Sequence, residues 1–449
     1  MAPFAARRTA HRPLAHRPLA HRLVVHVGPA AAIAIALAMF SSAHADVTNW
    51  IDTAGGAFSD PSNWSNGVPG SGDTAVFAIT PTSFPQVIIA GPTTIDRLLA
   101  TASHPTLVLS GQTLSVLGAS PELPAVEIGD DVGNNTLFIR QGALVAPSVS
   151  VGPLAGGGGT LYLGQLGAVT ATIGSTLVGD QGSGSLFVLS PASSFTTGEL
   201  WLGLATSGSG VFSSVGNSNT VVTGDAHVGI DGIGRIWTTN HDVHIEGDLY
   251  TGAGPASEGE LRLQQDGGDL VVDGSAFFGG EGLTTVSMTD GPHLVIGGDL
   301  TVASTATVDL KLWNHTVPAE PALSVAGSIV DPEGHLQPRL KISGSTPVFT
   351  PPIGSVYAVI ASGTPTKWPE LQVPAISLAR RYVPVETPTL LAVEVQAGLA
   401  DLNGDNAIDQ ADLDVLLGAW GRGSSPADFN GDGTVDGADL GMFLSALGV

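Results

Sequence analysis

The stretch VGPLAGGGGTLYLGQLGAVTATIGSTLVGDQGSGSLFVLS, residues 151–190, holds two copies of one phrase and decides the fold. Each copy begins with an apolar residue followed by Gly, at Gly152 and Gly179, and continues through a turn rich in Gly, Ser or Asp. Each then runs into a short segment in which apolar residues alternate. Alternation with a period of two is typical of β-strands rather than helices. The repeating unit is therefore a turn followed by a strand.

The same phrase occurs seven times in the middle of the chain, with a mean spacing of 25 residues. A period of this size, built from strands, predicts a coiled solenoid. Stacked coils bury a continuous apolar core and pair each backbone group with the coils above and below. Gly suits a corner that needs a positive φ angle or a close backbone approach. The marker glycines are Gly129, Gly152, Gly179, Gly203, Gly229, Gly252 and Gly279.

A set of β-sandwich domains is the alternative, because their hairpins also alternate with turns at intervals of about 8–12 residues. The regular return of one phrase favours the solenoid. We expect a mainly β chain, with a right-handed parallel β-helix or β-solenoid as its body and a small helical domain at its end. An N-terminal cap with the first coils would occupy 46–125, the repeats 126–293, and a C-terminal β cap or small β domain 294–396.

Composition excludes several classes of function. The chain has 449 residues with 16 Lys and Arg against 40 Asp and Glu, and five of the arginines precede residue 46. Such an acidic surface disfavours binding to nucleic acid and to anionic membranes, and it suits metal cations. The chain contains no Cys, which rules out disulfides, iron–sulfur clusters and Cys-ligated zinc.

Residues 1–45 have the three parts of a secretory signal peptide. A basic segment at 7–22 precedes an apolar run at 23–40, and Ala43 and Ala45 supply the small residues that signal peptidase reads. Cleavage there makes the mature chain secreted or extracellular, at or beyond the cell surface, with no membrane insertion. The alternative is an uncleaved anchor, because a run of about 18 apolar residues nearly spans a bilayer.

Aromatic residues mark the start of the body, in Asn49-Trp50 and in FSDPSNWSNGVPGSGDTAVF at residues 58–77. This phrase resembles the opening of secreted β-helical, adhesin-like and passenger-like proteins of planctomycete-type bacteria. We expect Trp50, Trp64 and Phe77 to cap the open end of the solenoid, which would otherwise expose apolar core and unpaired strand edges. The alternative is an aromatic site on which a sugar stacks.

The last 49 residues contain two matched acidic loops that begin 27 residues apart. Oxygen-bearing side chains occupy positions 1, 3, 5, 9 and 12 of both loops, and position 7 would contribute its backbone carbonyl. Ca²⁺ takes roughly six to eight oxygen ligands and is bound by this pattern in helix–loop–helix sites. Two Ca²⁺ ions are therefore expected. The predicted ligands are Asp401, Asn403, Asp405, Ala407, Asp409 and Asp412 in loop one, and Asp428, Asn430, Asp432, Thr434, Asp436 and Asp439 in loop two.

Each loop runs into an apolar pattern with spacings of three and four, which predicts an amphipathic helix. The two helices are expected to pack against each other. Position 6 of each loop must turn sharply, which Gly433 does freely and Asn406 tolerates better than most residues. The apolar faces would consist of Leu413, Leu416, Leu417 and Trp420 in the first helix, and Leu440, Phe443, Leu444 and Leu447 in the second.

A duplicated loop-then-helix unit, with no helix before either loop and Asp at position 12, resembles the type I dockerin domain. We assign residues 397–449 to such an EF-hand-like domain. The resemblance implies folding on Ca²⁺ binding and attachment to a cohesin-like protein domain, often within assemblies that degrade polysaccharides. It also implies partner-reading residues at loop positions 10 and 11, which are Gln410, Ala411, Gly437 and Ala438. The Pro/Thr-rich linker that usually precedes a dockerin is missing.

The body offers one dense cluster of titratable residues, HDVHIEGD at 241–248. On a strand, Asp242, His244 and Glu246 would share the outward face. This set is either a metal or acid–base site or, as is more common, the solvated face of a strand. The sequence contains no nucleophile elbow, phosphate loop or HExxH motif, and we predict no catalytic residue.

Two functions stay open. The first is a non-catalytic secreted surface, scaffold or adhesin-like protein, attached through its calcium-loaded C-terminal domain. The second is a dockerin-bearing polysaccharide hydrolase or lyase, or a polysaccharide-binding component of an extracellular complex. An outer groove lined by acids and aromatic residues from successive coils would favour the second, whereas outer faces of Thr, Ser and Gly would favour the first. The many small residues of the body favour the first.

Overall fold

The structure is a computed structural model. It describes residues 46–447 apart from 79–84, 102–103, 217, 265–267, 290, 304–305, 312–319, 332–335, 337, 342–351, 369 and 374–376. The predicted signal peptide at 1–45 lies outside the described residues. A parallel β-solenoid of about 10 turns makes up the body, so the predicted fold class is confirmed and the β-sandwich alternative is wrong.

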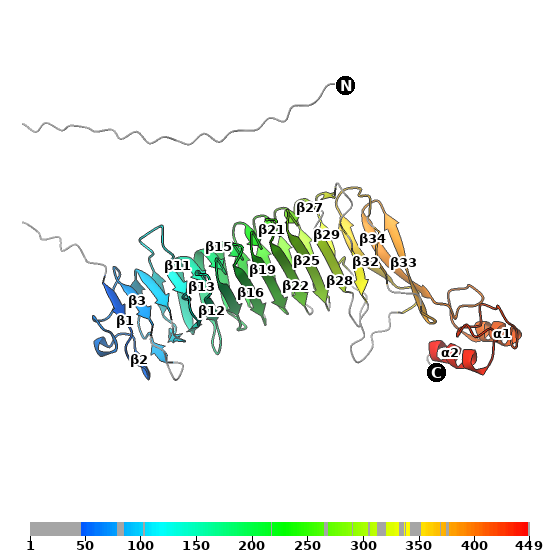
Figure 1. The fold of residues 1–449 in the computed structure, drawn as a ribbon, viewed down its shortest axis with the longest axis horizontal. Coiled ribbons are helices and arrows are strands. Elements are labelled where there is room, and N and C mark those ends of the chain that lie inside the picture. Colours follow the sequence, from blue (N-terminus) through cyan, green and yellow to red (C-terminus); the bar gives the residue numbers. More distant parts are fainter. Residues whose placement is uncertain are drawn as a thin grey trace, which may run out of the picture. The chain divides into compact units, whose positions relative to one another are not determined.

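One side of the solenoid is a parallel sheet of 12 strands (Figure 1). Successive coils pair in register, so that Leu137 of one coil aligns with Leu161 of the next. The strands of this sheet are β2 (Gly55–Ala57), β4 (Gln86–Ile88), β7 (Thr106–Val108), β10 (Asn134–Arg140), β12 (Gly158–Leu163), β14 (Ser183–Val188), β16 (Ser209–Val215), β19 (Ile233–Thr239), β22 (Glu258–Gln264), β25 (Leu283–Thr289), β28 (Ala306–Lys311) and β31 (Arg339–Lys341).

The other sides of the coils belong to a sheet of 22 strands with two arms. Three long strands serve both arms: β11 (Gly142–Val151), β13 (Val169–Val178) and β15 (Ser194–Leu202). In the other coils two short strands take their place. The first arm contains β1 (Val47–Asn49), β3 (Thr74–Phe77), β6 (Arg97–Ala100), β9 (Val126–Ile128), β18 (Ala226–Val228), β21 (Leu249–Thr251), β24 (Ala276–Phe278), β27 (Leu300–Val302) and β30 (Ile329–Val330). The second contains β5 (Thr93–Ile95), β8 (Thr113–Val116), β17 (Asn219–Val222), β20 (Val243–Ile245), β23 (Leu270–Val272), β26 (Leu294–Ile296), β29 (Leu323–Val325) and β32 (Val356–Ser362).

The core of the body consists of apolar columns that run from coil to coil. Alternation along each strand turns every second side chain inward, and parallel register places like residues above one another. Fully burying one such side chain stabilises the fold by about 1.5–3 kcal/mol. Along the 12-stranded sheet one column is fully buried and consists of Leu137, Leu161, Leu186, Phe212, Ile236, Leu261 and Val286.

Glycines at the coil corners have the backbone geometry that the repeat predicts. All seven markers have a positive φ angle, between 60° and 121°. A Cβ atom added to Gly152 would lie 2.3 Å from the carbonyl oxygen of Ser183 in the next coil. Because no real Cβ atom approaches an oxygen so closely, this corner admits only Gly.

An aromatic cluster closes the N-terminal end of the core. Trp50, Trp64 and Phe77 are at most 3% exposed, and the rings of Trp50 and Trp64 meet edge to face with centroids 5.1 Å apart. The indole N–H of Trp64 donates to the carbonyl oxygen of Phe58 at 2.7 Å. A short 3₁₀ turn, η1 (Pro61–Asn63), leads into Trp64. Since these rings are packed within the core, their faces are unavailable to a sugar.

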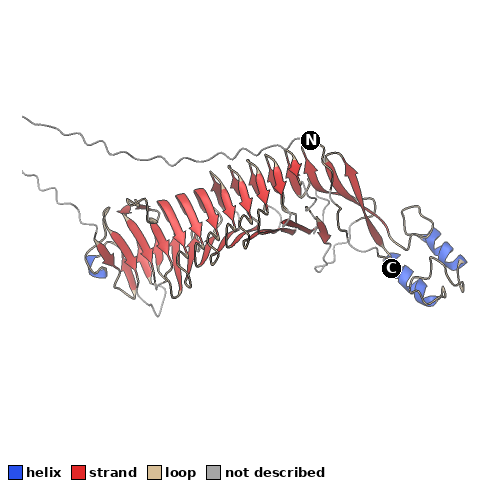
Figure 2. Cartoon of the chain, turned by 45° about the horizontal axis from the view of Figure 1, so that its top comes forward, coloured by secondary structure: helices blue, strands red, loops and turns tan. Residues whose placement is uncertain are grey.

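At the C-terminal end, parallel pairing continues past residue 293 as far as β32. Two antiparallel strands, β33 (Arg380–Thr387) and β34 (Leu390–Ala397), then follow, with β34 paired to both β32 and β33. The remaining described residues form two loops and two helices, α1 (Gln410–Gly418) and α2 (Gly437–Leu447), drawn in blue in Figure 2. No helix leads directly into either loop, as the sequence predicts: β34 ends shortly before loop one, and residues 419–427, which contain no helix, separate α1 from loop two.

Candidate metal centre

Loop one, residues 401–412, is closed by hydrogen bonds from its own backbone to its carboxylates. Oδ1 of Asp401 accepts from the amide of Gly404 at 2.7 Å, and Oδ2 accepts from the amide of Asn406 at 3.0 Å. At the far end of the loop, Oδ1 of Asp412 accepts from the amide of Leu402 at 2.7 Å. The first and last predicted ligands are thus held by the same turn of backbone.

Three of the six predicted ligands in loop one come together. One carboxylate oxygen from each of Asp401, Asp405 and Asp412 lies within 4.8 Å of the others, close enough to share one ion. Asp412 is fully buried, and a buried carboxylate is costly unless a positive charge compensates it. An all-oxygen donor set suits a hard cation such as Ca²⁺.

The other predicted ligands of loop one have defined places. The side-chain oxygen of Asn403 accepts from the amide of Asp405 at 2.8 Å, which keeps positions 3 and 5 side by side. Asp409 caps α1, since one of its carboxylate oxygens accepts from the amide of Ala411 at 2.7 Å. The side chain of Asp409 also accepts from the backbone amide of Asp412, which completes the cap. Ala407 lies at position 7, and its amide donates to Asp405 at 2.9 Å.

Loop two, residues 428–439, has the same hydrogen bonds. Asp428 accepts from the amides of Gly431 and Gly433, both at 2.9 Å, and Asp439 accepts from the amide of Phe429 at 2.7 Å. As in loop one, the side chain of Asn430 accepts from the amide of Asp432 and donates to the carboxylate of Asp432. The amide of Thr434 donates to the same carboxylate. Among the described residues, the group in loop one is the only set of three or more such side chains that comes this close together, so the carboxylates of loop two do not form an equivalent group.

Asp439 is held in its charged form by the backbone around it. A hydrogen bond from the amide of Asp436, with further bonds from those of Asn430 and Phe429, lowers the pKa of Asp439 below its usual value, although burial opposes this. A carboxylate with this pKa is ready to bind a cation near neutral pH. The same position in loop one, Asp412, is also completed by a capping bond from the amide of Asp409 at 2.9 Å.

The two helices pack around a small apolar core. Its fully buried residues are Ala400, Leu416, Ala427, Val435 and Phe443, with Leu413, Leu440, Leu444 and Leu447 packed beside them. The expectation that Leu417 and Trp420 share this face is wrong, because each is 47% exposed. Leu417 lies about 100° around the helix from Leu416, and α1 ends at Gly418, before Trp420.

The predicted partner-reading residues are all exposed. Gln410 and Ala411 lie in the first turn of α1, and Gly437 and Ala438 in the first turn of α2. On the same side of α1, Val415 lies one turn from Ala411 and is 43% exposed, so the two form a small exposed apolar surface. Their contribution to binding a partner is a prediction that the structure alone does not test.

The cluster at 241–248 places its residues on the faces that the sequence predicts. Val243 and Ile245 are fully buried, whereas Asp242, His244 and Glu246 point outward. Nε2 of His244 lies 2.9 Å from a carboxylate oxygen of Asp273 in the next coil. Among the described residues, these side chains form no group of three that is close enough to hold a metal ion.

His241 differs from the rest of this cluster, because it lies inside the solenoid. Its Nδ1 is 3.3 Å from Oγ of Ser218 and its Nε2 is 3.2 Å from Oγ1 of Thr220, and all three residues are at most 9% exposed. Burial lowers the pKa of His241 from 6.5 to about 4. At neutral pH the ring is therefore uncharged and serves as part of the core.

A column of stacked aromatic rings on the first arm of the larger sheet was not predicted. Trp201 stacks on His227 at 3.8 Å between centroids, His227 on Tyr250 at 4.9 Å, and Tyr250 on Phe277 at 4.8 Å. Strand register places these residues directly above one another on successive coils. The recurrence of an aromatic residue two positions before a marker Gly is the sequence signal that would have identified it.

Carboxylates accompany this column two residues earlier on three coils. The indole N–H of Trp201 donates to Glu199 at 3.0 Å, and the hydroxyl of Tyr250 donates to Asp248 at 3.1 Å. Asp225 precedes His227 in the coil between them. Because the rings stack face to face, they present their edges, and the carboxylates, to the outside.

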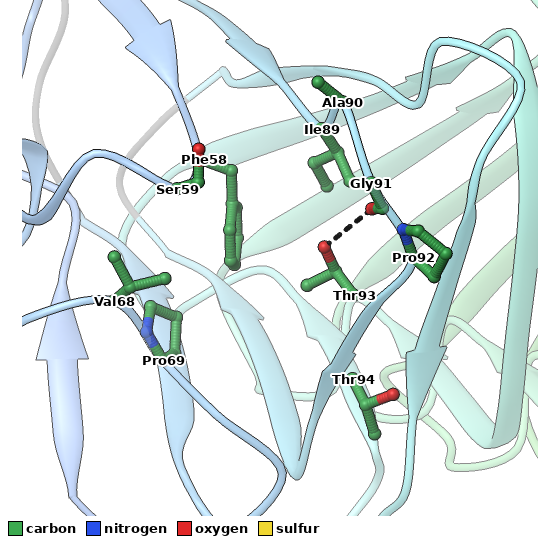
Figure 3. A pocket seen from close by; sticks show the side chains of 10 residues that line it. All are labelled: Phe58, Ser59, Val68, Pro69, Ile89, Ala90, Gly91, Pro92, Thr93 and Thr94. Carbon is green, nitrogen blue, oxygen red and sulfur yellow. Dashed lines mark hydrogen bonds between the residues drawn. The ribbon is translucent and has the colours of Figure 1, made fainter.

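Two of the hollows on the described part of the body have linings that bear on function. The first, about 290 Å³ in volume and shown in Figure 3, is bordered by Phe58, Pro69 and Pro92 and contains no titratable side chain. Its polar groups include the hydroxyl of Thr93, which donates to the carbonyl oxygen of Gly91 at 3.0 Å. Such a lining offers shape but no acid, base or nucleophile.

The second hollow is a groove of about 470 Å³ bordered by three carboxylates. Glu127 is paired with Arg97 at 3.1 Å, Glu122 is exposed, and burial raises the pKa of Asp180. The register of the first arm places Leu177, part of the groove lining, directly before Trp201 in the aromatic column. The groove and the column therefore follow one line along the body.

No family model, curated protein or solved structure matches this chain. Within the part of the chain that the structure describes, no helix has the length and apolar character needed to cross a membrane.

Proposed function

We propose that this protein is a non-catalytic, secreted surface or scaffold protein, whose C-terminal dockerin-like module binds two Ca²⁺ ions and attaches the solenoid to a cohesin-type partner. The observation that carries the proposal is the repetition of one hydrogen-bonded carboxylate arrangement in two loops. Asp412 and Asp439, the last residues of the loops, are both fully buried. Backbone amides already donate to both carboxylates, and one Ca²⁺ in each loop would compensate the charge that remains.

The charge of the module supports this proposal. Residues 401–449 contain nine Asp and a single basic side chain, Arg422. Without cations, the carboxylates of each loop repel one another at short range, which opposes folding. Binding of Ca²⁺ removes this repulsion, so that the free energy of binding contributes directly to folding of the module.

Calorimetric titration of the mature chain with Ca²⁺ tests the first part of the proposal. We expect two binding sites in the wild-type protein, one in Asp412→Asn and one in Asp439→Asn. Asp414→Asn is the matched control, because it removes the same charge from an exposed position of α1 outside both loops and should retain two sites. A wild-type chain that shows no saturable binding of Ca²⁺ would contradict the proposal.

The exposed apolar surface of α1 supports the second part. Ala411 and Val415 lie one turn apart on the solvent-exposed side of α1, and exposed apolar patches mark interaction sites. Binding of the calcium-loaded chain to recombinant cohesin domains of several specificities tests it. Val415→Asp should abolish binding to any cohesin that the wild type binds, because Val415 lies one turn from the predicted partner-reading residue Ala411. Val132→Asp, at an 83% exposed position of the body, should leave it unchanged.

A polysaccharide-binding role is the second candidate, favoured by the aromatic column and the adjoining groove. Carboxylates at Glu199, Asp225 and Asp248 can accept hydrogen bonds from sugar hydroxyls, and the ring edges of Trp201 and Tyr250 provide apolar contact. The ring faces are already occupied by one another, which limits the contribution of stacking.

Gel mobility in the presence of soluble neutral β-glucan tests this role, with polygalacturonate as the anionic comparison. Tyr250→Ala should abolish any retardation by the neutral glycan if the column binds it. Tyr162→Ala is the matched control, since Tyr162 belongs to an equivalent stack with Phe138 and Phe187 on the other sheet. Equal retardation of both variants and the wild type, or none at all, would remove this candidate.

A further inference from the structure

The C-terminal module is joined to the body without a flexible linker. Residues 398–400, which connect β34 to loop one, pair with the segment that precedes β33. The amides of Gly398, Leu399 and Ala400 donate to the carbonyl oxygens of residues 379, 377 and 378, at 3.2, 3.0 and 2.9 Å. The antiparallel pairing of β33 and β34 thus continues up to the first calcium ligand, Asp401.

Apolar packing crosses the same boundary. Ala400 is fully buried in the core of the module, and Leu378, which belongs to the paired segment of the body, packs against that core. The β33–β34 hairpin and the module therefore share side-chain contacts as well as backbone hydrogen bonds.

Asn406 makes the most direct connection between loop one and β34. Ala397, the last residue of β34, is 1% exposed, and its amide donates to Oδ1 of Asn406 at 2.8 Å. A buried amide that loses its acceptor is destabilising. The amide of Asn406 itself donates to Oδ2 of Asp401, a predicted Ca²⁺ ligand, at 3.0 Å. Asn406 is therefore bonded to the metal loop through its backbone and to the body through its side chain.

The corresponding residue of loop two has no such connection. Gly433 occupies the same position, with a φ angle of 89° against 65° for Asn406, and its amide makes the same bond to Asp428 at 2.9 Å. Without a side chain it cannot reach a second partner. Asn is one of the few residues besides Gly that tolerate such a φ angle, so position 6 combines the turn with an acceptor only in loop one.

We propose that Asn406 is a positioning residue that transmits the loading of loop one to the body, so that Ca²⁺ in loop one, but not in loop two, stabilises the β33–β34 hairpin. This rests on the proposed binding of Ca²⁺. When loop one is empty, repulsion among Asp401, Asp405 and Asp412 opens the turn, Asn406 moves away, and the amide of Ala397 loses its acceptor. The hairpin end then opens more often.

Hydrogen–deuterium exchange of the mature chain, with Ca²⁺ and with excess chelator, measures this coupling in peptides that cover residues 380–400. Ca²⁺ should slow exchange in these peptides about tenfold or more in the wild type, the size expected when a buried hydrogen bond stops opening. Asn406→Gly copies the natural residue of loop two, so it should still bind two Ca²⁺ while the hairpin no longer responds. Asn406→Asp keeps an acceptor oxygen and should restore the response.

Two loop variants complete the test. Asp401→Asn with Asp405→Asn should remove the response of the hairpin, whereas Asp428→Asn with Asp432→Asn should leave it intact. Calorimetry on the same samples separates the two proposals. Two bound Ca²⁺ with unchanged hairpin exchange would overturn the coupling alone, and a response that persists in Asn406→Gly would overturn the role of Asn406. Absence of any Ca²⁺ binding would overturn the proposed function and, with it, the coupling.

Discussion

The body and the C-terminal module are both built by repetition, but they satisfy their backbone amides in different ways. In the body, amides donate to carbonyl oxygens of neighbouring coils, as Gly152 does to Ile128 and Gly179 to Val151. In the module, the amides of both loops donate to carboxylates, as Gly404 does to Asp401 and Gly431 to Asp428. Neutral pairing can be extended coil by coil. Pairing with carboxylates gathers negative charge that needs a counterion.

The apolar cores of the body and the module also differ, in their size and in whether repetition enlarges them. Each coil of the body adds residues such as Leu261 and Val286 to one continuous buried column, so stability accumulates with the number of coils. The module buries only five apolar residues completely, three of which are Leu416, Val435 and Phe443. So small a core cannot support an independent fold, and such domains usually depend on metals or disulfides. We therefore expect folding of the module, rather than of the body, to depend on a bound ion.

Removal of calcium is expected to have the largest effect and to separate the two regions most clearly. Excess chelator should abolish most of the helical circular dichroism, which comes from α1 and α2, while the strand signal of the body persists. The control is magnesium added in place of calcium, which should restore less helix because Mg²⁺ demands smaller, octahedral sites. Helical signal that survives chelation would mean that the module folds on its own apolar core. The two regions would then not differ in their dependence on calcium.

The parallel solenoid was predictable because its signal is repeated. Gly152 and Gly179 each stand at a corner whose geometry excludes a Cβ atom, and the alternation beside them fixes which residues enter the core. The loops were predictable for a similar reason, since the spacing of their oxygen-bearing side chains occurs twice. When the pattern returns in each coil, a strand boundary that is predicted one residue too early or too late does not shift the predicted boundaries of the next coil.

Features that depend on a single side chain were not predictable. Helical spacing places Leu417 near Leu413, but Leu417 lies about 100° around the helix from the buried Leu416 and is exposed, and α1 ends before Trp420. The contact of Asn406 with Ala397 joins two residues whose pairing no spacing rule contains. The stack of Trp201 on His227 has a sequence signal, an aromatic residue two positions before successive marker glycines, but the contact between the rings depends on the register of single side chains between coils.

A cavity in the core of the body is the second-largest expected effect. Leu261 is fully buried at the centre of the column, and Leu261→Ala should lower the free energy of unfolding of the body by about 2–5 kcal/mol. Chemical denaturation followed by the strand signal measures it. Calcium affinity of the module should not change. Arg262→Ala, on the exposed face of the same strand, is the control. An equal loss in calcium affinity would show that the two regions unfold as one.

The buried His241 should make the stability of the body depend on pH. Its pKa is about 4 in the folded chain against 6.5 when exposed, so between these values the unfolded chain binds a proton that the folded chain does not. Stability is therefore fully present above pH 6.5 and falls as the pH drops towards 4, by about 3 kcal/mol. His241→Asn should flatten this part of the profile of unfolding free energy against pH. A variant with the same slope as the wild type would assign the pH dependence to other groups.

The smallest expected effect concerns an ion pair on the outside of the body. Nε of Arg235 lies 3.0 Å from Oε2 of Glu260 on the next coil, and both side chains are about a quarter exposed. Glu260→Gln should lower the unfolding free energy by less than about 1 kcal/mol, because solvent and salt screen such pairs. Repeating the measurement in high salt should reduce even this difference. A larger loss would mean that electrostatic pairing, rather than buried columns and neutral hydrogen bonds, joins the coils, and the body would then resemble the module in depending on charge. The expected small value instead follows from the buried column directly beneath this pair, where Ile236 and Leu261 are fully excluded from water.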